Sequence, residues 1–223
     1  MQQALGRCVA SWYPGATGVT NAVRLSGGAS QETWTFDIVH AGGNIGAILR
    51  RAPPGYGASP SRAAGLDAEA ALMQLAYDAG IPSPHVMHVL APQDELGTGF
   101  IMQRVEGETI ARKILRDEQF AKARPMLARQ IGQIAAGIHG LDAAKLPKLR
   151  QMTSTKEIAD LEDEYRGFDW PRPVFELALR WLRDHDPGPS DEVTLVHGDF
   201  RHGNLIIGPD GVRAVLDLSL IHI

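Results

Sequence analysis

The sequence predicts an α+β protein of two lobes, because its first half is rich in strand patterns and its second half in helical ones. Residues 32–39, 45–51 and 99–105 are short apolar or alternating stretches between turn residues, which is typical of strands. Later in the chain, apolar residues recur at the spacing of one helix face, at Leu127, Ile131, Ile134 and Ile138. Residues 104–109 (RVEGET) are the expected joint between the two lobes.

The composition is that of a globular protein with a substantial core. The chain has 223 residues, of which 44% are hydrophobic and 22% charged. Its net charge of −4 gives no basic excess that would indicate nucleic-acid binding. Cys8 is the only cysteine, so no intrachain disulfide forms, which fits a reducing compartment. The sequence has no secretory signal pattern and no apolar stretch of membrane-spanning length, so we expect a soluble cytoplasmic protein. The sequence does not indicate the oligomeric state.

In the first lobe, turns rich in glycine and proline separate the predicted strands. Residues 23–28 lead into a small-residue turn before the strand at 32–39, and the turn at 40–44 precedes the strand at 45–51. The proline and glycine content of residues 52–61 predicts a loop.

One helix is predicted in this lobe, followed by two strands. Asp67 is positioned to cap a helix that runs to about Ala79, where a glycine and a proline end it. Residues 85–92 and 99–105 then form two strands around a turn. In the second lobe, Pro171 opens a helical stretch that has Val174, Leu177 and Trp181 on one side.

The last 30 residues predict a polar loop followed by a β-hairpin. Residues 194–196 form a short apolar strand, and the polar loop 197–204 follows. Residues 205–207 and 212–216 are strands, joined by a Gly-Pro-Asp-Gly sequence that suits a type I turn.

The hairpin places chemically useful side chains at one end. Asn204 precedes its first strand and Asp217 follows its second, so antiparallel pairing brings them together beside Asp199. Oxygen ligands of this kind suit Mg²⁺, and a further acid near a metal-bound phosphate can deprotonate an attacking hydroxyl. As turn and cap residues alone, the same side chains would carry no chemistry.

Residues 197–199 (HGD), with Asn204 five positions after the aspartate, resemble the catalytic loop of the aminoglycoside phosphotransferase-like kinases. Residues 215–217 (VLD) resemble the metal-binding aspartate strand of that family. The resemblance implies a protein kinase-like two-lobe fold that uses ATP and Mg²⁺ and phosphorylates a hydroxyl of a small molecule. It assigns Asp199 as the catalytic base, Asn204 and Asp217 as Mg²⁺ ligands, and Arg201 as a cation facing the γ-phosphate.

The first lobe contains candidates for the remaining parts of such a site. By resemblance, Gly27, Gly28 and Ser30 form the turn over the phosphates, and Arg50 takes the place of the third-strand cation. Glu69 is its candidate partner, since a carboxylate on an apolar helix face needs a cation. The alternative interpretations are that Gly27, Gly28 and Ser30 are a plain hairpin end and that Arg50 is a surface charge. Glu69 would then be a first-turn acid that suits the helix dipole.

Residues 100–107 (FIMQRVEG) resemble the kinase hinge. Met102 is then the gatekeeper, and the backbones of Gln103 and Val105 meet the adenine edge; a buried strand running into a loop is the alternative. His85 and His88 are three apart in a strand pattern and face opposite sides, so this pair predicts no metal site.

The ordered motifs predict three parts: a nucleotide-binding lobe at 1–104, a partial catalytic lobe at 105–217 and a non-native tail at 218–223. The residue strings of these motifs resemble the branch of the family that is found alone or fused to acyl-CoA dehydrogenases. This resemblance suggests a hydroxy-acid or hydroxyacyl acceptor. That family continues with Asp-Trp-Glu and further helices, whereas Asp217 is followed by LSLIHI, which matches a translated sequencing adapter. We therefore expect a strand-rich N-lobe with one helix, an incomplete helical C-lobe, low solubility and weak or no activity.

Two other functions are compatible with the sequence. A metal-dependent hydrolase could be built on His197, Asp199 and His202, whose imidazoles would favour a transition metal. A non-catalytic module would bind the nucleotide and show no turnover that depends on Asp199.

Overall fold

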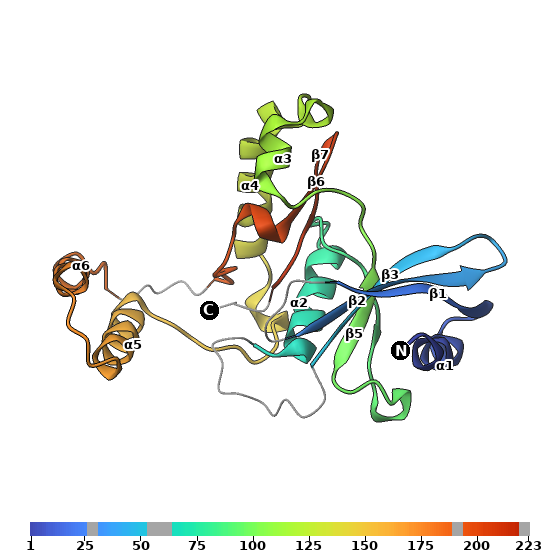
Figure 1. Ribbon diagram of the computed structural model, residues 1–223. Coiled ribbons are helices and arrows are strands. Elements are labelled where there is room, and N and C mark those ends of the chain that lie inside the picture. Colours follow the sequence, from blue (N-terminus) through green and yellow to red (C-terminus); the bar gives the residue numbers. More distant parts are fainter. Residues whose placement is uncertain (26–30, 53–63, 189–193, 219–223) are drawn as a thin grey trace.

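The computed structural model describes residues 1–25, 31–52, 64–188 and 194–218 (Figure 1). Its architecture is α+β, as predicted. A five-stranded antiparallel sheet of order β1-β2-β3-β5-β4 forms the first half, and a two-stranded sheet, β6-β7, lies near the end of the chain. Among the described residues, no helix combines the length and the apolar character needed to cross a membrane.

The five strands confirm the predicted strand pattern and its alternation. Their bounds are β1 Ala16–Leu25, β2 Glu32–His40, β3 Ile45–Arg51, β4 Val86–Val89 and β5 Gly99–Gln103. Ile48 of β3 pairs with Met102 of β5, and Arg50 lies two residues further along the same face. Arg51 points to the other face, where its guanidinium pairs with Glu32 at 2.8 Å.

In the part of the first half that the structure describes, two helices accompany this sheet, one more than predicted. Helix α1 (Gln2–Trp12) buries Leu5, Cys8 and Val9, but it has no side-chain N-cap, so the usual start signal is missing from the sequence. Helix α2 (Leu66–Asp78) begins one residue before Asp67, which lies in the first turn and is not the predicted cap.

The second half is helical, as predicted. Its helices are α3 Ala111–Arg116, α4 Arg124–His139, α5 Ser154–Gly167 and α6 Pro173–Asp184. Helix α4 carries the predicted apolar stripe. Helix α6 begins at Pro173, not at Pro171, and α5 was not predicted because Ile158 is its one buried residue.

The hairpin near the end of the chain is confirmed, with strands β6 Leu205–Gly208 and β7 Gly211–Val215. Residues 194–196 form no strand, contrary to the prediction, although Leu195 is fully buried. The segment after β5 pairs with this hairpin, because Glu108 and Ile207 exchange two backbone hydrogen bonds of 2.9 Å. The hairpin is thereby fixed against the segment that leaves the five-stranded sheet.

The hydrophobic core formed by the described residues has two clusters. One lies between α1 and the sheet and includes Phe36 and Leu49. The other continues from α2 and β5 to α4 and the hairpin. Leu218, the first residue of the predicted non-native tail, is fully buried in this second cluster.

Helices α5 and α6 pack on each other and stand apart from the five-stranded sheet (Figure 1). The predicted apolar stripe of Val174, Leu177 and Trp181 lies on α6, but all three side chains are exposed. Leu179, two residues from Leu177, is the buried side chain of this helix. An apolar face of this kind promotes association in water.

These two leucines allow a matched test of the arrangement. Leu179 is 6% exposed and Leu177 is 69% exposed. Leu179→Ala should lower the unfolding free energy by about 2–5 kcal/mol because it leaves a cavity. Leu177→Ala should change it by less than about 0.5 kcal/mol. Urea unfolding followed by circular dichroism measures both, and equal losses would contradict the described packing of α6.

Candidate active site

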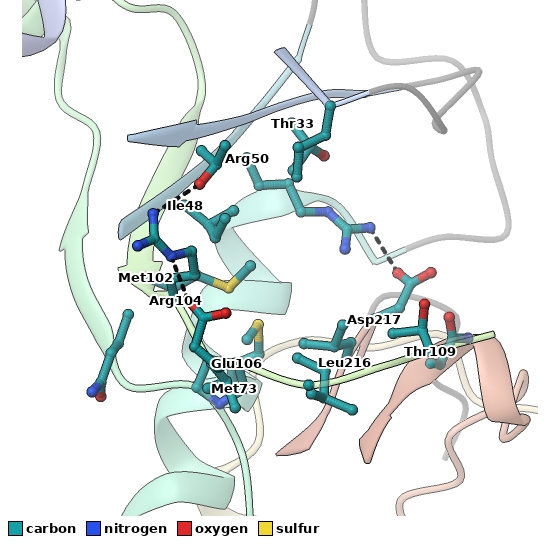
Figure 2. Close-up of a pocket in the computed structure, with 18 of the residues that line it drawn as sticks. Thr33, Ile48, Arg50, Met73, Met102, Arg104, Glu106, Thr109, Leu216 and Asp217 are labelled. Carbon is teal, nitrogen blue, oxygen red and sulfur yellow. Dashed lines mark hydrogen bonds and ion pairs between the residues drawn. The ribbon is translucent and has the colours of Figure 1, made fainter. Parts of the chain in front are cut away.

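A cavity of about 660 Å³ lies between the five-stranded sheet and the hairpin (Figure 2). Ile48 and Met102 form its wall on the sheet side, and Met73 of α2 adds to it. Ile206 and Leu216 form the wall on the hairpin side. Two apolar walls contributed by separate parts of the chain make a slot that suits a flat aromatic group.

The segment after β5 closes one end of this cavity. Gln103 and Val105 both line it, as predicted for a hinge. The Gln103 N–H donates to the His85 carbonyl at 2.9 Å, and the Arg104 N–H donates to the Gly46 carbonyl at 2.9 Å. Within the described part of the chain, the Val105 N–H has no hydrogen-bond partner, so it is available to a ligand.

Arg50 connects the sheet to the hairpin through its guanidinium. Its Nη1 lies 3.0 Å from Glu69 Oε1, and its Nη2 lies 2.8 Å from Asp217 Oδ1. Its Nε donates to the side chain of Gln31. In Figure 2, Arg50 reaches from the sheet toward Asp217 on the opposite side of the cavity.

Glu69 is the buried member of this group, with no exposed side-chain surface. Arg50 contacts it as an ion pair, but neither carboxylate oxygen accepts a hydrogen bond of normal geometry from the described residues. Burial raises the pKa of Glu69 to about 7, an effect that Arg50 opposes and Asp217 reinforces. The structure therefore confirms the predicted contact and shows that the Glu69 charge is costly to maintain.

The polar loop places Asp199 beside Asn204. The Asn204 Nδ2 donates to Asp199 Oδ2 and to the Asp199 carbonyl, both at 2.9 Å. Arg201 Nε lies 3.0 Å from each Asp199 carboxylate oxygen. Because Nδ2 faces Asp199, the Asn204 Oδ1 is left as an acceptor with no donor among the described residues.

The backbone of Leu216 joins this loop to the end of β7. Its N–H donates to the Asn204 carbonyl at 2.8 Å, and its carbonyl accepts from His197 Nε2 at 2.9 Å. His197 Nδ1 accepts the Asp199 N–H at 3.3 Å, so both contacts require the tautomer protonated at Nε2. Asp217 follows at a φ of 62°, a left-handed conformation uncommon outside glycine.

The structure brings most of the predicted residues to one place. Those that line the cavity are Arg50, Gln103, Val105, Asn204 and Asp217. Glu69 is held by Arg50, and Asp199 and Arg201 adjoin the cavity through Asn204. The predicted turn residues Gly27, Gly28 and Ser30 lie outside the described residues.

Sequence reasoning missed several residues of this site. Arg104 pairs with Asp37 at 2.8 Å and with Glu106 at 2.9 Å beside the hinge, and nothing in its local sequence marks this role. Ile48 was identifiable, since it lies two residues before Arg50 on a predicted strand. His197 was considered as a metal ligand, yet both of its ring nitrogens are hydrogen-bonded to the backbone. That arrangement weighs against the hydrolase built on His197, Asp199 and His202.

Comparison with known proteins gives consistent results. A model described as the phosphotransferase enzyme family matches residues 21–223. Acyl-CoA dehydrogenase family member 11 of Gallus gallus is 28% identical over 99% of this chain, which spans only 28% of the length of that protein.

Solved structures are similar over the whole chain. A putative aminoglycoside phosphotransferase from Ralstonia eutropha has a TM-score of 0.74 at 20% identity, covering 100% of this chain and 66% of that one. Spectinomycin phosphotransferase in complex with ADP and spectinomycin has a TM-score of 0.60 at 12% identity, covering 100% and 70%. These likenesses confirm the predicted protein kinase-like fold.

The raised pKa of Glu69 predicts a pH dependence of stability. The side chain should ionise near pH 4.5 in the unfolded chain and near pH 7 in the folded one. The folded state binds this proton more tightly than the unfolded chain does. The contribution of protonated Glu69 to the free energy of unfolding is therefore complete below pH 4.5 and is lost as the pH rises to 7. The expected loss is about 3 kcal/mol in unfolding free energy.

Glu69→Gln removes the titrating group and should flatten the profile between pH 4.5 and 7. Asp67→Asn, an exposed change on the same helix, is the matched control and should keep the wild-type slope. Urea unfolding across this pH range measures the effect. Parallel profiles for Glu69→Gln and the wild type would show that Glu69 does not titrate in this window.

Proposed function

The chain belongs to the phosphotransferase enzyme family, and we propose that it transfers the γ-phosphoryl group of ATP, with Mg²⁺, to a hydroxyl of a small molecule. The observation that carries this proposal is the Asp199–Asn204 hydrogen bond beside a cavity that also holds Arg50 and Asp217. Those side chains supply a base, metal ligands and a phosphate-binding cation. Residues 1–104 would form the nucleotide-binding lobe, and residues 105–217 the catalytic lobe.

The cavity suits the adenosine part of ATP. Ile48 and Met102 face Ile206 and Leu216 across it, so a purine ring would be held between apolar side chains. The Val105 N–H and the Gln103 carbonyl would recognise the edge of the base. The spectinomycin phosphotransferase of similar fold was solved with ADP, which supports a nucleotide as the ligand.

The phosphates would lie toward Arg50. Its guanidinium offers several donors in a fixed plane, and the buried Glu69 limits its movement. Asn204 Oδ1 and the Asp217 carboxylate are hard oxygen ligands of the type that Mg²⁺ prefers, so these residues fit the ion. When bound, Mg²⁺ neutralises charge on the phosphate oxygens during transfer.

Asp199 would accept the proton of the attacking hydroxyl. Asn204 orients its carboxylate, and the backbone contact to His197 orients the loop. Arg201 contacts Asp199 from an exposed position, and rotation of its side chain would bring its charge to the γ-phosphate. For the acceptor, similarity to acyl-CoA dehydrogenase family member 11 supports a hydroxy acid or hydroxyacyl thioester.

Asp199→Asn tests the proposed base. ATP consumption with a panel of hydroxy acids and hydroxyacyl thioesters should fall about 10²–10⁴-fold in kcat, with nucleotide affinity nearly unchanged. Asp210→Asn is the matched control, because Asp210 is 71% exposed in the turn of the hairpin. Unchanged turnover in Asp199→Asn would remove Asp199 from this role. Nucleotide binding without turnover for any acceptor would fit both the non-catalytic module and the inactive, incomplete catalytic lobe that the sequence predicts.

Arg50 and Arg51 provide a second matched pair, since they are neighbours on opposite faces of β3. Arg50→Gln should weaken ATP binding about 10–100-fold through loss of charge-assisted contacts to the phosphates. Arg51→Gln should leave ATP affinity unchanged because Arg51 pairs with Glu32 away from the cavity. Calorimetric titration measures both affinities, and an equal effect of the two variants would contradict the proposed phosphate position.

A further inference from the structure

A second cluster of chemically active side chains lies in the N-terminal half. Cys8 of α1, His88 of β4 and Asp94 of the 3₁₀ turn Pro92–Asp94 each contribute one potential ligand atom to this cluster. These sulfur, nitrogen and oxygen atoms all lie within 4.8 Å of one another. The three residues come from separate elements, so tertiary packing alone brings them together.

The cluster is buried and its members are held in place. Cys8 and Asp94 are buried, and the His88 side chain is 20% exposed. The His88 Nε2 lies 2.8 Å from Asp94 Oδ2, which also accepts the Ala91 N–H at 2.7 Å. The Trp12 ring stacks on His88 at 4.9 Å with an angle of 3° between the rings. The Ala91 N–H and the Trp12 ring lie outside the proposed ligand set and orient Asp94 and His88, as supporting contacts do in metal sites.

One polar group beside the cluster is poorly satisfied without a ligand. The Trp12 Nε1–H is buried and has no hydrogen-bond partner among the described residues. A metal-bound thiolate would keep its charge in this environment and would accept the indole N–H.

We propose that Cys8, His88 and Asp94 form a binding site for a Zn²⁺-like transition-metal ion. A sulfur, an imidazole nitrogen and a carboxylate oxygen together favour Zn²⁺ or Co²⁺ over Mg²⁺. Tetrahedral coordination at usual bond lengths places the ligand atoms roughly 3.3–3.6 Å apart, so adjustments of about 1 Å bring them into position. Binding releases the thiol proton to solvent, and the fourth position takes a solvent molecule.

This site is separate from the proposed ATP site. None of its three ligands lines the cavity between the sheet and the hairpin. Occupancy would join α1 to the segment between β4 and β5 and would stabilise the N-terminal half. The inference therefore stands or fails independently of the phosphotransferase proposal, and its readouts do not depend on turnover.

Co²⁺ titration of the tag-free chain tests the proposal directly. We expect one equivalent of Co²⁺ to give d–d absorption of a tetrahedral ion and a thiolate-to-cobalt charge-transfer band. Cys8 is the only cysteine, so such a band can come from no other residue. Zn²⁺ should displace Co²⁺ and raise the Tm by roughly 5–10 °C at a hundredfold excess over Kd.

Substitutions provide the specificity control. Cys8→Ser and His88→Gln should each weaken binding at least tenfold, whereas His185→Gln, at the exposed histidine that follows α6, should not. If one of the two ligand variants fails to fold, the thiolate-to-cobalt charge-transfer band of the wild-type chain is sufficient to test the proposal. No binding at about 100 µM free ion, binding without a charge-transfer band, or equal binding by folded variants would overturn the proposal. The cluster would then be a hydrogen-bonded core network.

Discussion

The Arg50 guanidinium contacts carboxylates from both halves of the chain, Glu69 on α2 and Asp217 after β7. Glu69 is buried and accepts no hydrogen bond from the described residues, so its charge depends on Arg50. Arg50 in turn positions Asp217 over the cavity. The candidate site thus depends on one cation that connects the sheet, the adjacent helix and the hairpin. Phosphates that reach Arg50 would compete with Asp217 for its donors, which links nucleotide binding to the position of a proposed metal ligand.

The backbone of Leu216 supplies the second connection. It is hydrogen-bonded on one side to Asn204 and on the other to His197, while His197 also contacts the backbone of Asp199. The proposed base and the two proposed metal ligands are therefore positioned by one continuous network. Displacing the end of β7 should disturb all three together, so we expect substitutions there to affect binding and turnover jointly.

Local sequence patterns predicted much of this arrangement. Strand alternation separated Arg50 from Arg51, and the hairpin pattern placed Asn204 near the end of β7. The family and the fold also followed from short motifs. Helix α1 was missed because it lacks a capping residue, and the exposure of the α6 stripe was missed because periodicity does not show what covers a face.

Contacts distant in sequence were the hardest to predict. The spacing between His85 and His88 predicts no metal site, whereas in the structure His88 of β4 lies beside Cys8 and Asp94. Arg104, which follows β5, similarly pairs with Asp37 on β2. Such contacts depend on strand register and helix packing, which residue spacing along one segment does not contain.

We propose that the cavity binds a metal–nucleotide complex with its phosphates between Arg50 and the hairpin. A crystal structure with Mn²⁺ and a non-hydrolysable ATP analogue tests it most directly. We predict the base between Ile48 and Leu216, an anomalous Mn²⁺ peak at Asn204 and Asp217, and the γ-phosphate near Asp199. A nucleotide bound elsewhere, or Mn²⁺ bound by His197 and His202, would contradict the account.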